Sequence, residues 1–190
     1  MKQMLAICLV FLSVITCEKQ HTATLEDLKP WKLDDKYFKA NLRYLYFVSE
    51  SCEIPRTNET FDTIQKMYNL PLDAKDCHDG VYRAATPPDP YDYRHVITLT
   101  IRNEKIVNVD YDEVHLDGHG KQSDTLYCKE MSVAGTTPAI AYPIMEKQLV
   151  DNQNIMQVDG VTGASYSRFR FRYAAMMALV SARLSEPNNE

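Results

Sequence analysis

The feature that most constrains the fold is a pair of short segments in the middle of the chain that both have strand character. Residues 95–101 (HVITLTI) alternate in part and are rich in β-branched side chains, and residues 106–111 (IVNVDY) repeat this character. Only residues 102–105 (RNEK) separate the two segments. Two such runs joined by a short polar segment predict an antiparallel hairpin. The chain therefore contains a sheet, which its other elements must cover.

The other predicted elements of the main domain flank this hairpin. A short strand is expected over residues 79–84 and a brief one over residues 155–158, and a loop over residues 117–121. A helix is expected over residues 138–152, capped by Thr136 or Thr137, with Ile140, Ile144, Gln148 and Leu149 on one side and Pro143 inside it. The last helix is expected over residues 165–184.

The last helix shows the clearest apolar periodicity in the chain. Its large side chains recur at steps of four, three, four and four residues, which places them on one stripe that faces the core. These side chains are Phe169, Tyr173, Met176, Val180 and Leu184.

The N-terminal part reads as an extension of the main domain. A tether is expected near residues 18–30, followed by helices over residues 34–50 and 60–70, the second stopped by Pro71. The predicted fold class is therefore α+β, with a small, mainly antiparallel sheet flanked by helices and an N-terminal two-helix extension. A chain of 190 residues with 45% hydrophobic residues can bury one ordinary core.

The first seventeen residues predict export. A lysine near the start precedes an apolar run that is too short to span a bilayer, which is typical of a secretory signal peptide over residues 1–16. Cys17 stands where the apolar run stops, and the segment resembles the lipobox of bacterial lipoproteins, in which this cysteine receives the lipid. We therefore expect a lipoprotein on the extracytoplasmic side of a bacterial cell envelope. The alternative is signal-peptidase cleavage beside a chance cysteine.

Charge and cysteine usage exclude several classes of function. The net charge of −5, without a long basic stretch, argues against nucleic-acid binding. Apart from Cys8 and Cys17, the chain holds Cys52, Cys77 and Cys128, an odd number that permits at most one disulfide; Cys52 with Cys77 is the pairing we expect. No CxxC pair occurs, which argues against dithiol exchange and against zinc bound by cysteine.

The segment DGVTGAS, residues 159–165, carries the chemistry that the sequence suggests. Gly163 and Ala164 form a turn with almost no side-chain bulk, so the backbone can approach a ligand closely. Ser165 is expected at the cap of the last helix, where free N–H groups and the helix dipole favour a phosphate.

The segment 79–183 resembles the FMN-binding domain of the flavin-carrying C subunit of the sodium-pumping NADH:quinone reductase and of related electron-transfer lipoproteins. Its Asp-Gly-x-Tyr opening at Asp79 and its hairpin match that family, although Glu104 replaces a glycine in the turn. The family signature Asp-x-x-Ser/Thr-Gly-Ala-Ser/Thr is complete here, in the residues Asp159, Thr162, Gly163, Ala164 and Ser165.

The resemblance implies a covalent flavin. A flavin transferase would move FMN from FAD onto the hydroxyl of Ser165, in an FMN-binding domain of residues 79–185 that follows a tether and extension (17–78) and precedes a tail (186–190). The chain would then be an electron carrier rather than a stand-alone enzyme, with membrane redox proteins as donors or acceptors and a lipid anchor in the membrane. Two alternatives stay open: a lipoprotein adaptor without flavin, and a reductase that binds FMN non-covalently.

Two further clusters of polar residues are candidate binding groups. Arg168, Arg170 and Arg172 follow the motif at the helix end that disfavours cations, so one of them is a candidate partner of the FMN phosphate, and a solvated arginine face is the alternative. The loop that holds His115, Asp117 and His119 offers possible ligands for a divalent metal. A glycine-flanked polar loop explains these three residues equally well, and we predict no metal from the sequence.

Overall fold

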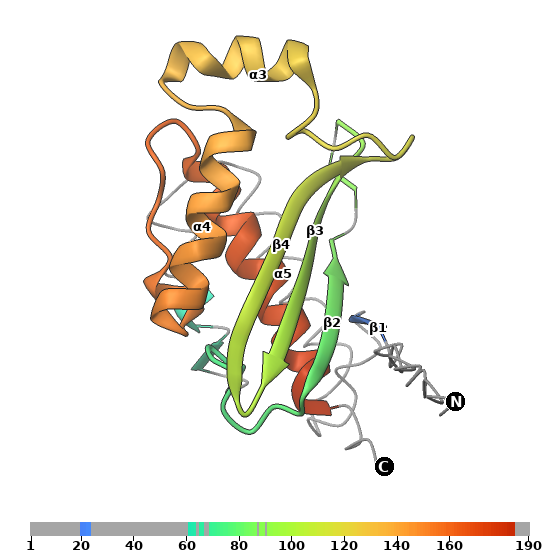
Figure 1. Cartoon of the computed structure of the whole chain (residues 1–190), viewed down its shortest axis with the longest axis vertical. Helices are drawn as coiled ribbons and strands as arrows, with labels where there is room; N and C mark the ends of the chain where they lie inside the picture. Colours follow the sequence, from blue (N-terminus) through green and yellow to red (C-terminus); the bar gives the residue numbers. More distant parts are fainter. Residues whose placement is uncertain are drawn as a thin grey trace, which may run out of the picture.

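The sheet of the computed structural model has four strands in the order β1-β2-β3-β4 (Figure 1). The structure describes residues 20–23, 61–63, 65–66, 69–86, 88–89 and 91–184. The strands are β1 (Gln20–Ala23), β2 (Gly80–Ala85), β3 (Tyr93–Arg102) and β4 (Lys105–His115). β1 runs parallel to β2, and the other two pairs are antiparallel. The predicted α+β class with a mainly antiparallel sheet is confirmed, but β1 replaces part of the expected tether.

The predicted hairpin is formed by β3 and β4. Asn103 and Glu104 both have positive φ angles, 50° and 57°, and Arg102 pairs with Lys105 across the two-residue loop. Two consecutive left-handed residues are the signature of the hairpin turn whose twist matches that of the strands. Both strands continue beyond the predicted bounds, because the pairing extends to Tyr93 and His115.

The Asp-Gly-x-Tyr segment connects the start of β2 to the turn of this hairpin through a side-chain hydrogen bond. The Asp79 carboxylate accepts a hydrogen bond of 2.7 Å from the Asn103 N–H, and the Tyr82 hydroxyl donates to the His78 carbonyl at 2.9 Å. A Cβ atom at Gly80 would lie 2.9 Å from the Tyr82 hydroxyl oxygen. Glycine is therefore required where the tyrosine folds back, and this part of the family resemblance reflects the fold rather than a ligand.

Helices α4 (Pro138–Asn152) and α5 (Ser165–Leu184) have the predicted bounds and lie against the sheet (Figure 1). α4 packs against β4, whereas α5 packs against β3 and β2. Fourteen of the twenty residues of α5 are buried, so its buried surface is wider than the predicted stripe. His78 and Cys77 lie against α5, because the His78 N–H donates to the Ala182 carbonyl and the Cys77 thiol contacts the Leu179 carbonyl.

The buried side of α4 differs from the predicted one. Ile140 and Ile144 are 55% and 41% exposed, while Ala141, Met145 and Leu149 are fully buried. Leu149 is buried, as its predicted side required, but Ile140 and Ile144 are not, because packing against β4 buries the adjacent face of the helix that carries Tyr142. Pro143 lies inside the helix without ending it, and Thr137 is its N-cap.

Three elements depart from the predictions or were not foreseen. The expected strand at 155–158 is instead a 3-10 helix, η3 (Ile155–Gln157), because the Asn154 side chain accepts a hydrogen bond from the Met156 N–H and closes a tight turn. Helix α3 (Thr125–Met131), capped by the Asp124 side chain, and the 3-10 helix η2 (Ser132–Ala134) fill a stretch for which no element was predicted.

The described part of the N-terminal extension packs into the same core. Residues 61–63 and 65–66 are helical, within the predicted second helix, and the helix has ended by Asn69, which has a φ angle of 49°. Phe61, Leu70 and Ala74 join the core cluster. The predicted helix over 34–50, the signal peptide over 1–16 and Cys17 lie outside the described residues, and in the described part no helix is long and apolar enough to cross a membrane.

Cys77 and Cys128 are free thiols. Cys52, the expected disulfide partner of Cys77, lies outside the described residues. Cys77 is buried in the core, and this burial raises the pKa of its thiol to about 11. The residue acts as a small apolar side chain, inert toward exchange at neutral pH.

Candidate functional site

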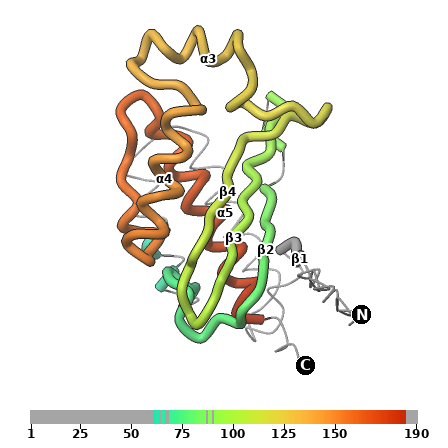
Figure 2. Tube along the Cα trace, in the orientation of Figure 1, coloured from blue at the N-terminus to red at the C-terminus, as the bar shows by residue number. Residues whose placement is uncertain are grey.

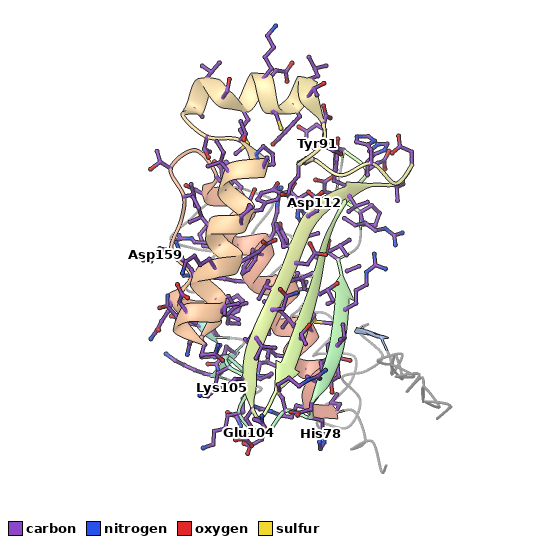
Figure 3. All side chains as sticks on the ribbon, in the orientation of Figure 1. His78, Tyr91, Glu104, Lys105, Asp112 and Asp159 are labelled. Atoms are coloured by element: carbon purple, nitrogen blue, oxygen red, sulfur yellow. The ribbon has the colours of Figure 1, made fainter. Side chains whose placement is uncertain are left out.

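The DGVTGAS segment is the connection between η3 and α5. This connection runs alongside α4 to the start of α5, as Figure 2 traces. Asp159, Gly160, Thr162 and Gly163 are exposed. Asp159 is held to α4 by its N–H, which donates to the Gln148 side chain at 2.6 Å, and its side chain projects outward (Figure 3). The segment is therefore accessible from solvent along most of its length.

A tight turn precedes the helix. The Ala164 N–H donates to the Val161 carbonyl at 2.8 Å, and Gly163 has a φ angle of 84°. A Cβ atom at Gly163 would lie 2.8 Å from the Ala134 carbonyl oxygen and 3.1 Å from the Thr136 side chain. Glycine is required here both for the left-handed conformation and because the turn packs closely against the last residue of η2.

Ser165 is the first residue of α5, and Ala164 rather than Ser165 stands before the helix, one position from the predicted cap. Ser165 is half-buried and stands at the positive end of a twenty-residue helix. The N–H groups of the first helical turn have no partner within the helix, and the helix dipole adds partial positive charge there. An anionic group on the Ser165 oxygen would be stabilised by both.

The three arginines after the motif lie in different environments. Arg172 donates two hydrogen bonds from its Nη2, to the Met156 carbonyl at 2.8 Å and to the Val158 carbonyl at 2.7 Å. Burial, followed by the charge of Arg168, lowers the pKa of Arg172 to about 10. Arg172 therefore holds the segment that enters the motif, and its role is structural.

Arg168 is the arginine that lies against the motif. Its guanidinium group packs on Gly160, since a Cβ atom there would be 3.6 Å from its atoms, and it also stacks over the Phe169 ring at 4.9 Å. Within the described part of the chain its buried Nε has no hydrogen-bond partner, which is also true of the Nε atoms of Arg170 and Arg172, so the contact with Gly160 is what distinguishes Arg168. Of the three arginines, Arg168 is thus the one placed to meet an anion on the motif.

A buried polar network lies beneath the first turn of α5. Glu113 accepts a hydrogen bond of 2.9 Å from the Ser167 hydroxyl and forms an ion pair of 2.5 Å with Lys121. His95 pairs with Glu113 across β3 and β4, and its Nδ1 lies 3.1 Å from the Tyr111 hydroxyl. The side chains of His95 and Glu113 are 0% and 1% exposed. The network ties the start of α5, two residues from Ser165, to the sheet.

Burial and neighbouring charges shift the pKa values of His95 and Glu113 in this network. Burial lowers the pKa of His95 to about 4, so the imidazole is neutral at pH 7. Burial alone would raise the pKa of Glu113, but His95, the Lys121 ammonium and Arg170 beside it outweigh burial and lower it to about 2. Glu113 is therefore a buried carboxylate whose charge is stabilised by the neighbouring cationic groups, of which Lys121 is paired with it directly.

Comparison with known proteins gives two relatives. No model of a known protein family matches the chain. The chain is 33% identical over 110 residues to the 15 kDa lipoprotein of Treponema pallidum, and the match covers 57% of this chain and 78% of that protein. The chain belongs to the family of this 15 kDa lipoprotein.

The chain also resembles a solved structure. The crystal structure of the CPE2226 protein from Clostridium perfringens aligns with this chain at a TM-score of 0.53 and 29% identity, over 56% of this chain and 88% of that chain. Neither name mentions a flavin, so the FMN-binding resemblance stays a prediction.

In this member of the 15 kDa lipoprotein family, the loop after β4 brings together His115, Asp117 and His119. One ligand atom from each residue lies within 4.8 Å of the others. The sequence pattern named these residues, and the structure shows that they converge.

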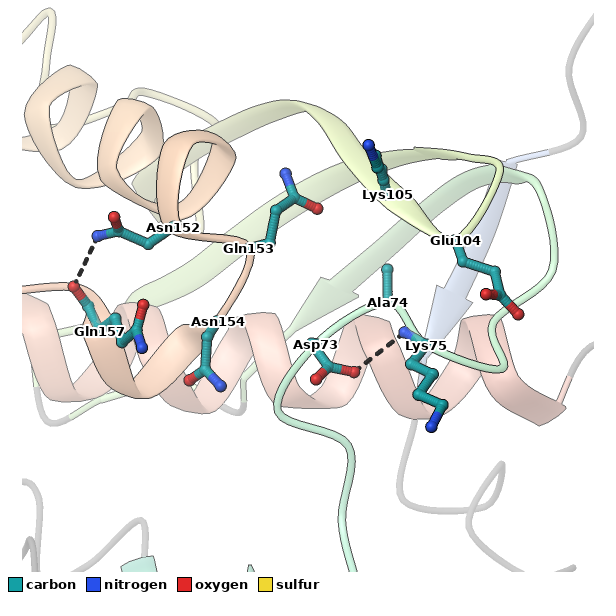
Figure 4. Close-up of a pocket in the computed structure, with 9 residues that line it drawn as sticks. All are labelled: Asp73, Ala74, Lys75, Glu104, Lys105, Asn152, Gln153, Asn154 and Gln157. Atoms are coloured by element: carbon teal, nitrogen blue, oxygen red, sulfur yellow. Dashed lines mark hydrogen bonds between the residues drawn. The ribbon is translucent and has the colours of Figure 1, made fainter.

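A cleft in the described part of the chain lies at a different place. It has a volume of about 370 Å³ and lies at the sheet end that bears the β3–β4 turn (Figure 4). The Gln153 amide lines it but is fully used, accepting from the Ile106 N–H and donating to the Ile106 carbonyl, both at 2.8 Å. Glu104 and Lys105 mark this end, opposite Tyr91 (Figure 3). The cleft is thus a seam between α4 and the hairpin, away from the motif.

Sequence reasoning missed the His95, Glu113 and Lys121 network. The available signal was the alternation of β3 and β4, because His95 shares the inward face of Ile97 and Leu99, and Glu113 that of Tyr111. A charged residue at an inward-facing position predicts a buried partner. The partner, Lys121, lies outside both strands and could not be identified from periodicity.

Proposed function

We propose that the chain is an exported, lipid-anchored flavoprotein that carries FMN through a phosphoester on Ser165 and serves as an electron carrier in the bacterial cell envelope. The observation that carries the proposal is the setting of Ser165. Ser165 is the first residue of a twenty-residue helix and follows a turn in which Gly163 has no room for a Cβ atom, and the Arg168 guanidinium group packs on Gly160 of the same segment.

The residues present fit a phosphate ester. Ser165 would supply the ester oxygen, and the N–H groups of the first helical turn would stabilise the phosphate charge. Arg168 would add a charge-assisted hydrogen bond to the phosphate. The phosphate would then be a partner for the Arg168 Nε, which has no hydrogen-bond partner within the described part of the chain. When bound, FMN supplies the redox chemistry, while the protein sets its position and exposure.

Two observations support the anchor and the compartment. The relative that is 33% identical is by name a lipoprotein, and Cys17 follows an apolar run of signal-peptide length. A lipid on Cys17 would hold the carrier at the membrane with its redox partners, and several acyl chains bind far more firmly than one. Covalent attachment would prevent loss of FMN outside the cytoplasm.

The test is the intact mass of the denatured full-length chain, produced together with a flavin transferase. We expect an added mass of one FMN residue in the wild type and in Ser165→Thr, which keeps the hydroxyl. Ser165→Ala should lack the adduct, whereas Ser132→Ala, at an exposed serine in η2, should keep it. An adduct that persists in Ser165→Ala would refute attachment at this residue.

The same experiment separates the two alternatives. An adaptor would be colourless even with the transferase, and a reductase with non-covalent FMN would be yellow when native but colourless after precipitation. Either result would replace the proposed carrier function.

Arg168 gives a second, independent test. Arg168→Ala should slow flavin incorporation about tenfold, which corresponds to roughly 1.4 kcal/mol. The matched control is Arg102→Ala, because Arg102 lies at the β3–β4 turn, away from the motif. This variant should leave the rate of flavin incorporation unchanged. Equal rates for the two variants would remove Arg168 from the site.

A further inference from the structure

The loop between β4 and α3 is built so that two imidazoles face one carboxylate. The His119 Nδ1 lies 2.5 Å from the Asp117 Oδ1, and the His115 Nδ1 lies 3.0 Å from the same oxygen. The two imidazole rings stack with their centroids 4.8 Å apart. Two histidines and a carboxylate that converge in this way form the ligand set preferred by zinc and by similar divalent transition metals.

Backbone pairing holds the histidines opposite each other. The His115 N–H donates to the His119 carbonyl at 2.8 Å, and the Gly118 N–H donates to the His115 carbonyl at 2.9 Å. Val114 and Gly120 form a β-bridge next to them. The chain thus reverses direction in a tight turn. The backbone of this turn places the side chains of His115 and His119 close together.

Two neighbouring side chains complete the surroundings. The Tyr93 hydroxyl lies 3.0 Å from the His119 Nε2, which orients that ring. An oxygen of the Asp124 carboxylate lies 3.8 Å from the same nitrogen. Hydrogen bonds to the second nitrogen of a ligand histidine are typical of metal sites, because they fix the ring and its tautomer.

Lys121 is a cation that lies near the loop. Lys121 lies over the Tyr93 ring at 4.4 Å, but its ammonium is paired with Glu113. Asp117 and Asp124 provide two negative charges on the side of the histidines. The balance at the histidines therefore favours a bound cation.

We propose that His115, Asp117 and His119 bind one divalent transition metal ion, with zinc as the expected metal and water completing the coordination. A tetrahedral zinc site with bonds of about 2.0–2.2 Å separates its ligand atoms by roughly 3.3–3.6 Å. The ligand atoms here lie within 4.8 Å of one another, so small side-chain rotations suffice. The half-exposed setting leaves a coordination position open to solvent.

The test is a Zn²⁺ titration of the full-length chain, purified without a histidine tag and freed of metal by chelation. We expect one Zn²⁺ per chain by calorimetry, and Co²⁺ in its place should give the visible absorption of a cobalt site with nitrogen and oxygen ligands. His115→Ala and His119→Ala should each weaken binding at least tenfold.

Three controls make the result decisive. Asp117→Asn keeps the shape of the exposed loop and should also weaken binding at least tenfold, even if a histidine variant failed to fold. His78→Ala, a histidine at the other end of the sheet, should bind as the wild type does (Figure 3). Ser165→Ala should keep full metal binding, so the metal site and the flavin proposal fail independently. Absence of stoichiometric binding in the wild type, or unchanged affinity in His119→Ala and Asp117→Asn, would overturn the proposal.

Discussion

Replacing Lys121 by methionine tests the buried network that holds the first turn of α5. The ammonium of Lys121 and the carboxylate of Glu113 are 7% and 1% exposed and lie 2.5 Å apart. Methionine keeps the length of the side chain but leaves the Glu113 carboxylate buried without its cation. Removing one partner of a buried pair costs about 3–5 kcal/mol, because a buried charge is left uncompensated.

The titration of Glu113 gives a second route to the magnitude. Its pKa falls from the ordinary 4.5 to about 2 in the folded protein. At about 1.4 kcal/mol for each pH unit, this difference corresponds to about 3 kcal/mol of stability, present above pH 4.5 and lost as the pH falls toward 2. His95, Lys121 and Arg170 share this stabilisation, so it does not measure the loss of Lys121 alone. The cost of breaking a buried pair therefore sets the expectation, and Lys121→Met should lower the free energy of unfolding by about 3 kcal/mol at pH 7.

The assay is guanidinium unfolding of the full-length chain, followed by circular dichroism, for Lys121→Met, Glu113→Gln and the double variant. The double variant should cost less than the sum of the single ones, because it leaves no unpaired charge. The deficit of Lys121→Met should shrink as the pH falls from 7 to 4, since its Glu113 takes up a proton more readily. A cost of less than about 1 kcal/mol, or additive costs, would refute the assignment of a coupled buried pair.

Two further predictions concern the turn and the histidine of the network. Gly163→Ala should lower the free energy of unfolding by about 1–2 kcal/mol for its φ angle alone, and by more because of its contact with the Ala134 carbonyl. The matched control is Gly135→Ala, because Gly135 has a φ angle of 85° but no neighbour within 4 Å of an added Cβ atom. Equal changes in thermal unfolding for the two variants would disprove the close contact at Gly163. Because His95 has a pKa of about 4 when folded and about 6.5 when unfolded, stability should fall as the pH drops from 6.5 through 4, at about 1.4 kcal/mol per pH unit. The variant His95→Gln should lack this slope. Parallel pH profiles of stability for the wild type and His95→Gln would contradict a buried neutral imidazole.

The sequence by itself determined the local elements whose signals lie within a few residues. The β3–β4 hairpin follows from two β-branched runs around a short polar turn, and the ends of α4 and α5 follow from Pro138 and from the Gly163 turn. The motif at residues 159–165 was likewise visible as a bare turn before a long helix. These features depend on backbone preferences and on side-chain period, which a chain carries without its tertiary contacts.

Only the tertiary structure decided which groups meet. It selected the buried face of α4, it made residues 155–157 a 3-10 helix, and it separated the structural Arg172 from Arg168 at the motif. It also brought Lys121 to Glu113 and His119 to His115. The physical reason is that burial and charge pairing act between residues that the chain must first fold to bring together, and local pattern does not record those distances.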